Sequence, residues 1–123
     1  MYSHNFWNRV SYHDFEGPSM RLDERGRLVK SLGLQHALIL RNHGLLALGE
    51  TVPAAFIRFW RLNRACEVQL AAQAAKLRLP SPQVCEASYA MGEEFLTDQA
   101  ALGQLEFDSI LRKIEAKDAS YKN

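Results

Sequence analysis

The sequence predicts an α/β fold, in which a small mixed or antiparallel sheet is covered by helices. Two short apolar runs, Ala37–Leu40 and Leu45–Gly49, flank turn residues at positions 41–44, which is typical of a hairpin or of two successive core strands. A helical pattern of apolar residues then extends from Val52 to about Lys76. The chain has 123 residues, of which 47% are hydrophobic and 24% charged, so one small domain with a core is expected.

The N-terminal third predicts little regular structure before its first helix. Residues 1–20 are expected to be irregular or to hold a short strand at Val10–Tyr12, and to end in a turn at Gly17–Pro18. The segment Leu22–Gly33 predicts a helix, with acidic residues near its start and a glycine as its C-terminal stop. Its apolar residues have the spacing of one helical face: Leu22, Leu28, Val29 and Leu32.

The C-terminal half is expected to be helical throughout. Thr51 is a good N-cap for the long helix, and the prolines at 80 and 82 end it. Residues 83–117 predict one or two further helices, with a break near Gly92 or Gly103, and the last six residues are expected to be frayed. The expected buried face of the long helix consists of Val52, Phe56, Phe59, Leu62, Cys66 and Leu70.

Composition excludes several classes of function. The net charge is +1, so a nucleic-acid partner or an acidic membrane surface held by bulk charge is not expected. No apolar run is long enough to span a bilayer, and the first residues lack the apolar core of a secretory signal. The two cysteines, Cys66 and Cys85, are expected to be reduced, buried thiols of a cytoplasmic protein.

The best candidate for chemistry is His43, one of four histidines in the chain. It follows a core strand, at a turn that Asn42 would stabilise and that Gly44 would allow to fold sharply. A side chain in that place is rigidly held and still reaches solvent, as a metal ligand must. The alternative is a turn histidine that only packs or binds a carbonyl, and spacing alone favours this alternative, because the sequence has no HxH or HExxH motif.

A second candidate is the segment YHDFEG, in which four polar groups lie within five residues: Tyr12, His13, Asp14 and Glu16. It predicts either a carboxylate–histidine pair or a solvated surface turn, and spacing favours the turn. The arginines Arg58, Arg61 and Arg64 are suited to bind phosphate or a carboxylate, but more often form a solvated face or an intersubunit network. The aromatic residues Phe56, Phe59 and Trp60 indicate core or an oligomer interface rather than a cofactor pocket.

Four stretches together resemble the class II aldolase/adducin family, in the family's order, over residues 9–75. They are VSYHDFEGP, LDERGRLVKSLG, LILRNHGLLALGETVPAAF and NRACEVQLAA. The resemblance implies a three-layer α/β/α domain, a homo-oligomer that is a tetramer in the family, and a divalent ion, commonly zinc. Two ligands of that ion come from an HxH motif and a third from the NHG motif, whose histidine matches His43.

The same resemblance implies that residues 1–123 form a single truncated domain, the C-terminal half of a bacterial-type member. The upstream HxH motif and acid/base glutamate of the family are absent from this sequence, so the His43 site is expected to be incomplete and the chain inactive alone. The implied ancestor is a metal-dependent lyase or isomerase that acts on small sugar phosphates or related hydroxy-carbonyl compounds. No residue is assigned to catalysis or to substrate binding.

Two alternatives remain open. The stretch Ala65–Gln69 (ACEVQ) also resembles adducins, which favours a non-enzymatic module that binds actin or other cytoskeletal partners. The other alternative is a structural remnant that self-associates through an exposed sheet edge and the helix with Phe56 and Trp60.

Overall fold

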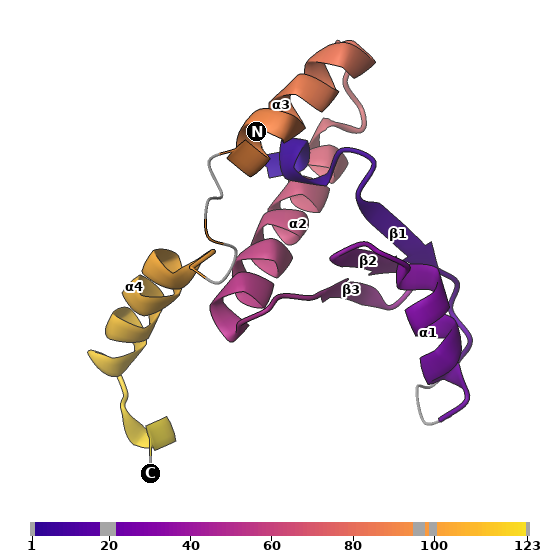
Figure 1. Cartoon of the computed structure of the whole chain (residues 1–123). Coiled ribbons are helices and arrows are strands. Elements are labelled where there is room, and N and C mark those ends of the chain that lie inside the picture. The colour runs from indigo at the N-terminus through magenta and orange to yellow at the C-terminus, as the bar shows by residue number, and fades with distance from the viewer. Residues whose placement is uncertain (1, 18–21, 95–97, 99–100, 123) are drawn as a thin grey trace.

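The computed structural model describes residues 2–17, 22–94, 98 and 101–122. Within these residues, three strands and four α-helices follow one another, with a short 3₁₀ helix near each end (Figure 1). They are η1 (Tyr2–Phe6), β1 (Val10–His13), α1 (Glu24–Leu32), β2 (Ala37–Leu40), β3 (Gly44–Ala47), α2 (Val52–Ala72), α3 (Pro82–Glu94), α4 (Gln104–Glu115) and η2 (Ser120–Lys122). Within the described ranges, no helix has the length and apolar character needed to cross a bilayer.

The sheet is mixed, as the sequence predicts. Its strand order is β1-β2-β3, with β1 and β2 parallel and β2 and β3 antiparallel. In the parallel pair His13 lies opposite Leu40, and in the antiparallel pair Leu40 lies opposite Gly44. The C-terminal ends of β1 and β2 therefore meet at one edge of the sheet, where the two segments singled out in the sequence become neighbours.

Both faces of the central strand are covered. Ala37 and Leu38 are adjacent in β2, so their side chains point to opposite faces, and they are only 1% and 0% exposed. Helix α1 packs against β1 and β2, whereas α2 packs against β3 and β2. Figure 1 shows the strands between these two helices. The arrangement is a small three-layer α/β/α unit, and it confirms the α/β fold class.

The buried face of α2 is not the predicted one. Val52 and Leu70 are each 70% exposed, and Phe59 also faces solvent; of the predicted face only Leu62 is buried. The buried residues are Pro53, Ala54, Ile57 and Leu62. At 3.6 residues per turn, Ala54 and Ile57 lie roughly opposite Val52 and Phe59. The helix carries apolar residues on both sides, and Ala54 and Ile57 form a buried cluster with Leu102, so periodicity alone indicated the wrong side.

Helix α1 has a similar correction. Leu22 precedes the helix and is 73% exposed, and Val29 is 70% exposed, so neither joins the core. The helix ends as predicted at Gly33, which has a positive φ of 60°. Upstream, Gly17 has a φ of 100°, as the predicted turn requires, while Pro18 lies outside the described residues.

The C-terminal segment forms two helices separated at Gly103, one of the two predicted breaks. Gly103 precedes α4 with a φ of 76°, whereas Gly92 lies inside α3. Helix α4 packs on α2 through Phe107, whose ring meets Phe56 edge to face at 5.5 Å. Residues 118–122 of the tail are not frayed as expected, because the Tyr121 hydroxyl donates to Glu115 at 3.0 Å, and the Lys122 ammonium pairs with the same carboxylate at 2.7 Å.

The two cysteines are free, as predicted, but they are only half-buried. Cys66 lies on α2 and Cys85 on α3, and each thiol is partly exposed to solvent.

Candidate functional site

The turn between β2 and β3 places His43 at the carboxyl edge of the sheet. The His43 amide donates to the Leu40 carbonyl at 3.0 Å, and the Arg41 amide donates to the His13 carbonyl at 2.9 Å, which ties the turn to β1. Asn42 has a φ of 57°, the left-handed conformation that asparagine tolerates better than most residues. Asn42 therefore makes the sharp bend that the sequence analysis assigned to Gly44, which instead begins β3.

The His43 side chain is exposed and stacks on Phe15, which follows β1. Their ring centroids are 6.1 Å apart and their planes are inclined by 19°. Near this pair, Arg41 forms an ion pair with Asp14 and lies over the Tyr12 ring, 5.0 Å from its centre. The turn and the YHDFEG segment thus form one surface. Asp14 and Tyr12 are engaged by Arg41 rather than by a histidine.

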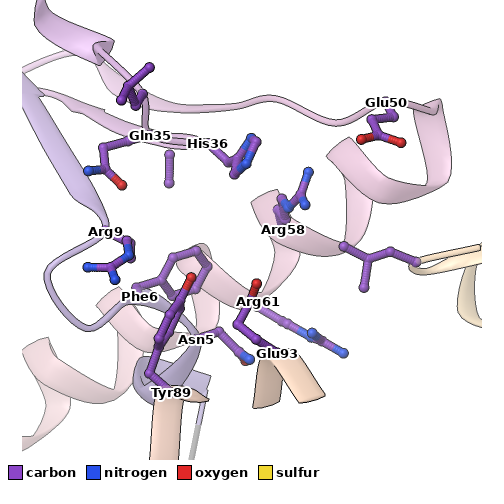
Figure 2. A pocket seen from close by; sticks show the side chains of 13 residues that line it. Asn5, Phe6, Arg9, Gln35, His36, Glu50, Arg58, Arg61, Tyr89 and Glu93 are labelled. Atoms are coloured by element: carbon purple, nitrogen blue, oxygen red, sulfur yellow. The ribbon is translucent and has the colours of Figure 1, made fainter. Parts of the chain in front are cut away.

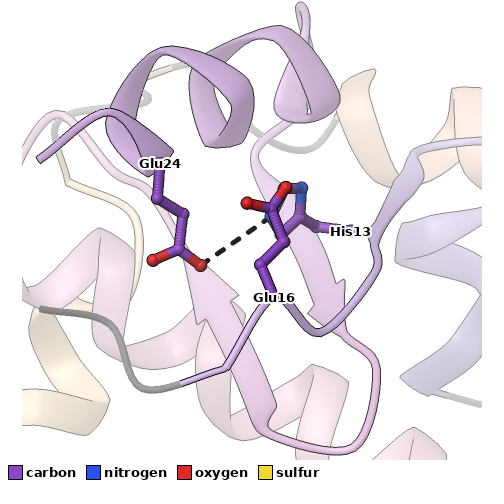
Figure 3. Close-up of side chains that lie close together, drawn as sticks. All are labelled: His13, Glu16 and Glu24. Atoms are coloured by element: carbon purple, nitrogen blue, oxygen red, sulfur yellow. Dashed lines mark ion pairs between the residues drawn. The ribbon is translucent and has the colours of Figure 1, made fainter. Parts of the chain in front are cut away.

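His13 is buried, whereas Tyr12, Asp14 and Glu16 are exposed, so the expected solvated turn holds for the segment except at its histidine. It is 7% exposed, and its Nδ1 lies 2.9 Å from the Ser31 hydroxyl of α1. Its Nε2 lies 3.7 Å from Oε1 of Glu16 and 3.9 Å from Oε1 of Glu24, and it has no hydrogen-bond partner (Figure 3). A carboxylate–histidine cluster therefore forms, with a second carboxylate that spacing did not indicate.

Glu16 is held by a cation from α1. Arg27 donates to both carboxylate oxygens of Glu16, from Nε at 2.9 Å, and pairs with Asp23 at 3.2 Å. The hydrogen bonds from Arg27 hold the pKa of the Glu16 carboxyl below its usual value. Glu16 is thus a charged acceptor with a fixed orientation at neutral pH.

Local sequence patterns did not indicate three residues of this cluster, namely Glu24, Arg27 and Ser31. All belong to α1, which packs against β1. Their distance from His13 along the chain leaves no local spacing signal, and only the acidic first turn of the predicted helix hinted at a carboxylate there.

Two members of the cluster, His13 and Glu24, line one small cavity together with His43. Its volume is about 30 Å³, enough for a single water molecule. Among the described residues, one group of three candidate metal ligands has its donor atoms within 4.8 Å of one another; it consists of His13, Glu16 and Glu24 and does not include His43. The cavity is lined by His13, Asp14, Phe15, Glu24, Leu28, Leu40, Arg41 and His43.

A second cavity, of about 220 Å³, lies at the opposite end of the sheet, where β1 and β2 begin, between η1, α2 and α3 (Figure 2). Two of the three arginines singled out in the sequence, Arg58 and Arg61, line it. Arg58 donates to the Leu48 carbonyl at 3.0 Å, and burial lowers the pKa of its guanidinium. Two acidic residues, Glu50 and Glu93, line the same cavity, so its charge is mixed rather than purely basic.

The third arginine, Arg64, pairs with Glu67 one turn along α2, as expected for a solvated helix face. Of the aromatic residues of α2, Phe56 packs against α4, whereas Phe59 and Trp60 are 44% and 39% exposed.

Comparison with solved structures supports this fold over nearly the whole chain. An aldolase II superfamily protein from Pseudomonas syringae superposes with a TM-score of 0.85 at 33% identity, over 99% of this chain and 49% of that one. An L-fuculose 1-phosphate aldolase from Glaciozyma antarctica superposes with a TM-score of 0.70 at 24% identity, over 94% of this chain and 43% of that one. The second likeness concerns the fold alone.

Comparison with curated protein sequences also finds class 2 aldolases, together with adducins. A Pseudomonas aeruginosa protein, by name an aldolase class 2 protein, is 34% identical over 116 residues, which is 92% of this chain and 45% of that protein. Beta-adducin of Rattus norvegicus is 45% identical over 64 residues, which is 51% of this chain and 9% of that protein. The chain thus spans less than half the length of these relatives.

A family model described as "Class II Aldolase and Adducin N-terminal domain" matches residues 1–70, more than half of the chain. The match includes β1, α1, both strands of the hairpin and most of α2, and therefore the whole edge that carries His13 and His43. Sequence match, fold and solved relatives agree, and the chain belongs to the class II aldolase and adducin family.

Proposed function

We propose that this chain is part of a metal-dependent lyase or isomerase of the class II aldolase type, and that His43 supplies one imidazole to its divalent ion. The substrates would be small sugar phosphates or related hydroxy-carbonyl compounds, and the assembly a cytoplasmic homo-oligomer. The observation that carries the proposal is the position of His43. An exposed imidazole at the end of a buried strand, oriented by Phe15, is suited to bind an ion that also contacts substrate.

His43 fits the role of one ligand but does not make a site. A catalytic zinc ion usually takes three protein ligands and keeps one open position, and no group of three candidate ligands that includes His43 forms within the described residues. The proposal therefore draws the other ligands from outside this sequence. When bound, the ion would act as a Lewis acid that stabilises negative charge on a substrate oxygen. The chain's own contribution is to bind it through His43 and to fix the ring through Asn42 and Phe15.

The test is a chimera in which this chain replaces the matched half of the Pseudomonas syringae protein, whose fold it shares. Zinc content is measured by metal analysis after dialysis, in the parent chimera and in His43→Ala. The variant is expected to lose one equivalent of zinc and any retro-aldol or epimerase activity on phosphorylated hydroxyketones. His36→Ala removes another exposed imidazole and is the matched control, expected to retain both. Retention of the full zinc content by a folded His43→Ala chimera would refute the proposal.

A second candidate is a non-enzymatic interaction module like that of the adducins. The identity of 45% with rat beta-adducin favours it over 64 residues, or 51% of this chain, whereas the bacterial relative matches 92% of the chain at 34% identity. Co-sedimentation of the purified chain with filamentous actin distinguishes the two. Saturable co-sedimentation would support the module, and its absence at high micromolar concentrations would remove actin binding as the function.

A further inference from the structure

We propose that His13, Glu16 and Glu24 form a second divalent-metal site, separate from His43, which binds a zinc-like ion and fastens the end of β1 to the first turn of α1. The three residues come from three places: the last position of β1, the segment that follows it, and the start of α1. Their donor atoms all lie within 4.8 Å of one another (Figure 3).

One buried nitrogen of the cluster has no hydrogen-bond partner. His13 is buried, with 7% of its surface exposed, and its Nε2 has no hydrogen-bond partner. Buried nitrogen and oxygen atoms in proteins nearly always have a partner, so an orphan at this depth calls for one, such as a water or a bound ion. The same atom points into the gap between the two glutamates, and one of them, Glu24, is itself only 8% exposed.

The distances between the donor atoms are close to those around a metal ion. Nε2 lies 3.7 Å and 3.9 Å from the nearest oxygens of Glu16 and Glu24, too far for hydrogen bonds. Two ligands of a tetrahedral zinc ion, each about 2.0–2.1 Å from the metal, lie about 3.3 Å apart. Nε2 and each of the two carboxylate oxygens would therefore need to approach by roughly half an ångström to close around an ion, and all three donor atoms lie within 4.8 Å of one another.

Neighbouring side chains hold the ligands in place through hydrogen bonds. If Ser31 accepts a hydrogen bond from Nδ1, at the observed 2.9 Å, the tautomer is fixed and the lone pair of Nε2 is left for a metal. Arg27 fixes the carboxylate of Glu16 through two oxygens and leaves further lone pairs on both. Metal-bound histidines and carboxylates are usually held in this way by outer residues.

The donor set also limits the kind of ion. One imidazole with two carboxylates suits zinc or manganese, whereas magnesium and calcium prefer oxygen ligands throughout. Two carboxylates balance the charge of a divalent cation, and a water molecule can complete a fourth position from the adjoining cavity of about 30 Å³. A proton shared between His13 and a glutamate is the rival occupant of the gap.

The test uses the whole chain with zinc chloride alone. Calorimetric titration is expected to show one site, and the Tm is expected to rise with the logarithm of free zinc, while the same concentrations of magnesium have no effect. In ¹⁵N spectra of the side chains, the Nε2 resonance of His13 is expected to shift on zinc addition. No zinc binding, or a zinc-independent spectrum of a doubly protonated His13, would overturn the proposal in favour of a shared proton.

Variants separate this site from that of His43. Glu24→Gln keeps the shape of the buried side chain and is expected to weaken zinc binding by about tenfold or more, and Ser31→Ala by about tenfold. Asp14→Asn, a neighbouring exposed carboxylate outside the cluster, is the matched control and is expected to change the affinity by less than about twofold. His43→Ala is likewise expected to retain zinc.

If His43→Ala abolishes binding while Glu24→Gln does not, the second site is refuted and the proposed function gains support. If Glu24→Gln abolishes binding and the chimera still loses one zinc equivalent on His43→Ala, both proposals stand. The two can therefore fail separately.

Discussion

The imidazole of His43 lies nearly parallel to the ring of Phe15, with 6.1 Å between the ring centroids and 19° between the planes. Phe15 follows β1 and His43 follows β2, so the contact exists only because these strands are parallel neighbours. The contact restricts the plane of the exposed imidazole.

Replacement of Phe15 by alanine is therefore expected to weaken zinc binding at His43 by about tenfold in the chimera, because the ring loses its support. Since Phe15 is 52% exposed, thermal stability is expected to change little. Zinc affinity is measured by competition with a chromophoric chelator. Phe59→Ala, at another exposed phenylalanine, is the control, and equal affinities in the two variants would show that the stacking has no part in metal binding.

Leu38→Ala is expected to destabilise the chain by about 2–5 kcal/mol, because it leaves a cavity at the most deeply buried large side chain, which is 0% exposed. Urea denaturation followed by circular dichroism measures the effect. Leu34→Ala makes the same chemical change at a side chain that is 97% exposed, and it is expected to alter stability by less than about 0.5 kcal/mol. Similar losses in both variants would mean that β2 is not the centre of the core.

Gly103→Ala is expected to loosen the packing of α4 on α2. An added Cβ would lie 2.5 Å from the Pro53 carbonyl oxygen and 2.6 Å from Cγ2 of Ile57, and the φ of 76° adds about 1 kcal/mol of backbone strain. The total cost is expected to be about 2 kcal/mol or more in the free energy of unfolding. Gly26→Ala, inside α1 with nothing within 4 Å of the new Cβ, is expected to stabilise by about 0.5–1 kcal/mol. The opposite ranking would contradict the observed helix packing.

The contact between the tail and α4 is expected to depend on pH in a defined window. Hydrogen bonds, first from Lys122 and then from Tyr121, hold the pKa of the Glu115 carboxyl below its usual value of 4.5. The hydrogen bond to Glu115 raises the pKa of the Lys122 ammonium above 10.5. Because the Glu115 pKa is lowered on folding, the stabilisation from this ion pair is complete above pH 4.5 and is lost as the pH falls through the folded-state pKa of Glu115. Because the Lys122 pKa is raised on folding, the same stabilisation is complete below pH 10.5 and is lost as the pH rises through the folded-state pKa of Lys122.

Carboxyl ¹³C titration by NMR checks this window. Lys122→Gln is expected to move the Glu115 midpoint upward, toward 4.5, whereas Lys113→Gln, on the same helix, is expected to leave it unchanged. An unaltered midpoint in Lys122→Gln would show that the ion pair does not form in solution.

The sequence predicted those features that local patterns determine. Two apolar runs around a short turn indicated β2 and β3, and Thr51 indicated the start of α2, where its hydroxyl accepts the Ala54 amide at 3.2 Å. The buried side of α2 was not predictable in this way, because apolar residues lie on both sides and only tertiary packing, such as that of Leu102 on Ala54 and Ile57, decides between them. Glu24 was missed because parallel pairing of β1 and β2 and the packing of α1 bring it to His13, and neither can be read from spacing.

For His43 the situation was different. Local spacing favoured an ordinary turn histidine, and only the resemblance over residues 9–75 indicated a metal ligand. The structure adds three features of His43 that spacing could not indicate: its exposed position, the stacked ring of Phe15 and the cavity that it shares with His13.

The most direct measurement is an anomalous-difference map at the zinc absorption edge, from crystals of the chimera grown with zinc. If His43 is a ligand of the catalytic ion, an anomalous peak is expected about 2.0–2.1 Å from one of its imidazole nitrogens, with further ligands from outside this sequence. A fully occupied zinc site elsewhere in the chimera, with the His43 imidazole pointing to solvent, would contradict the proposed function.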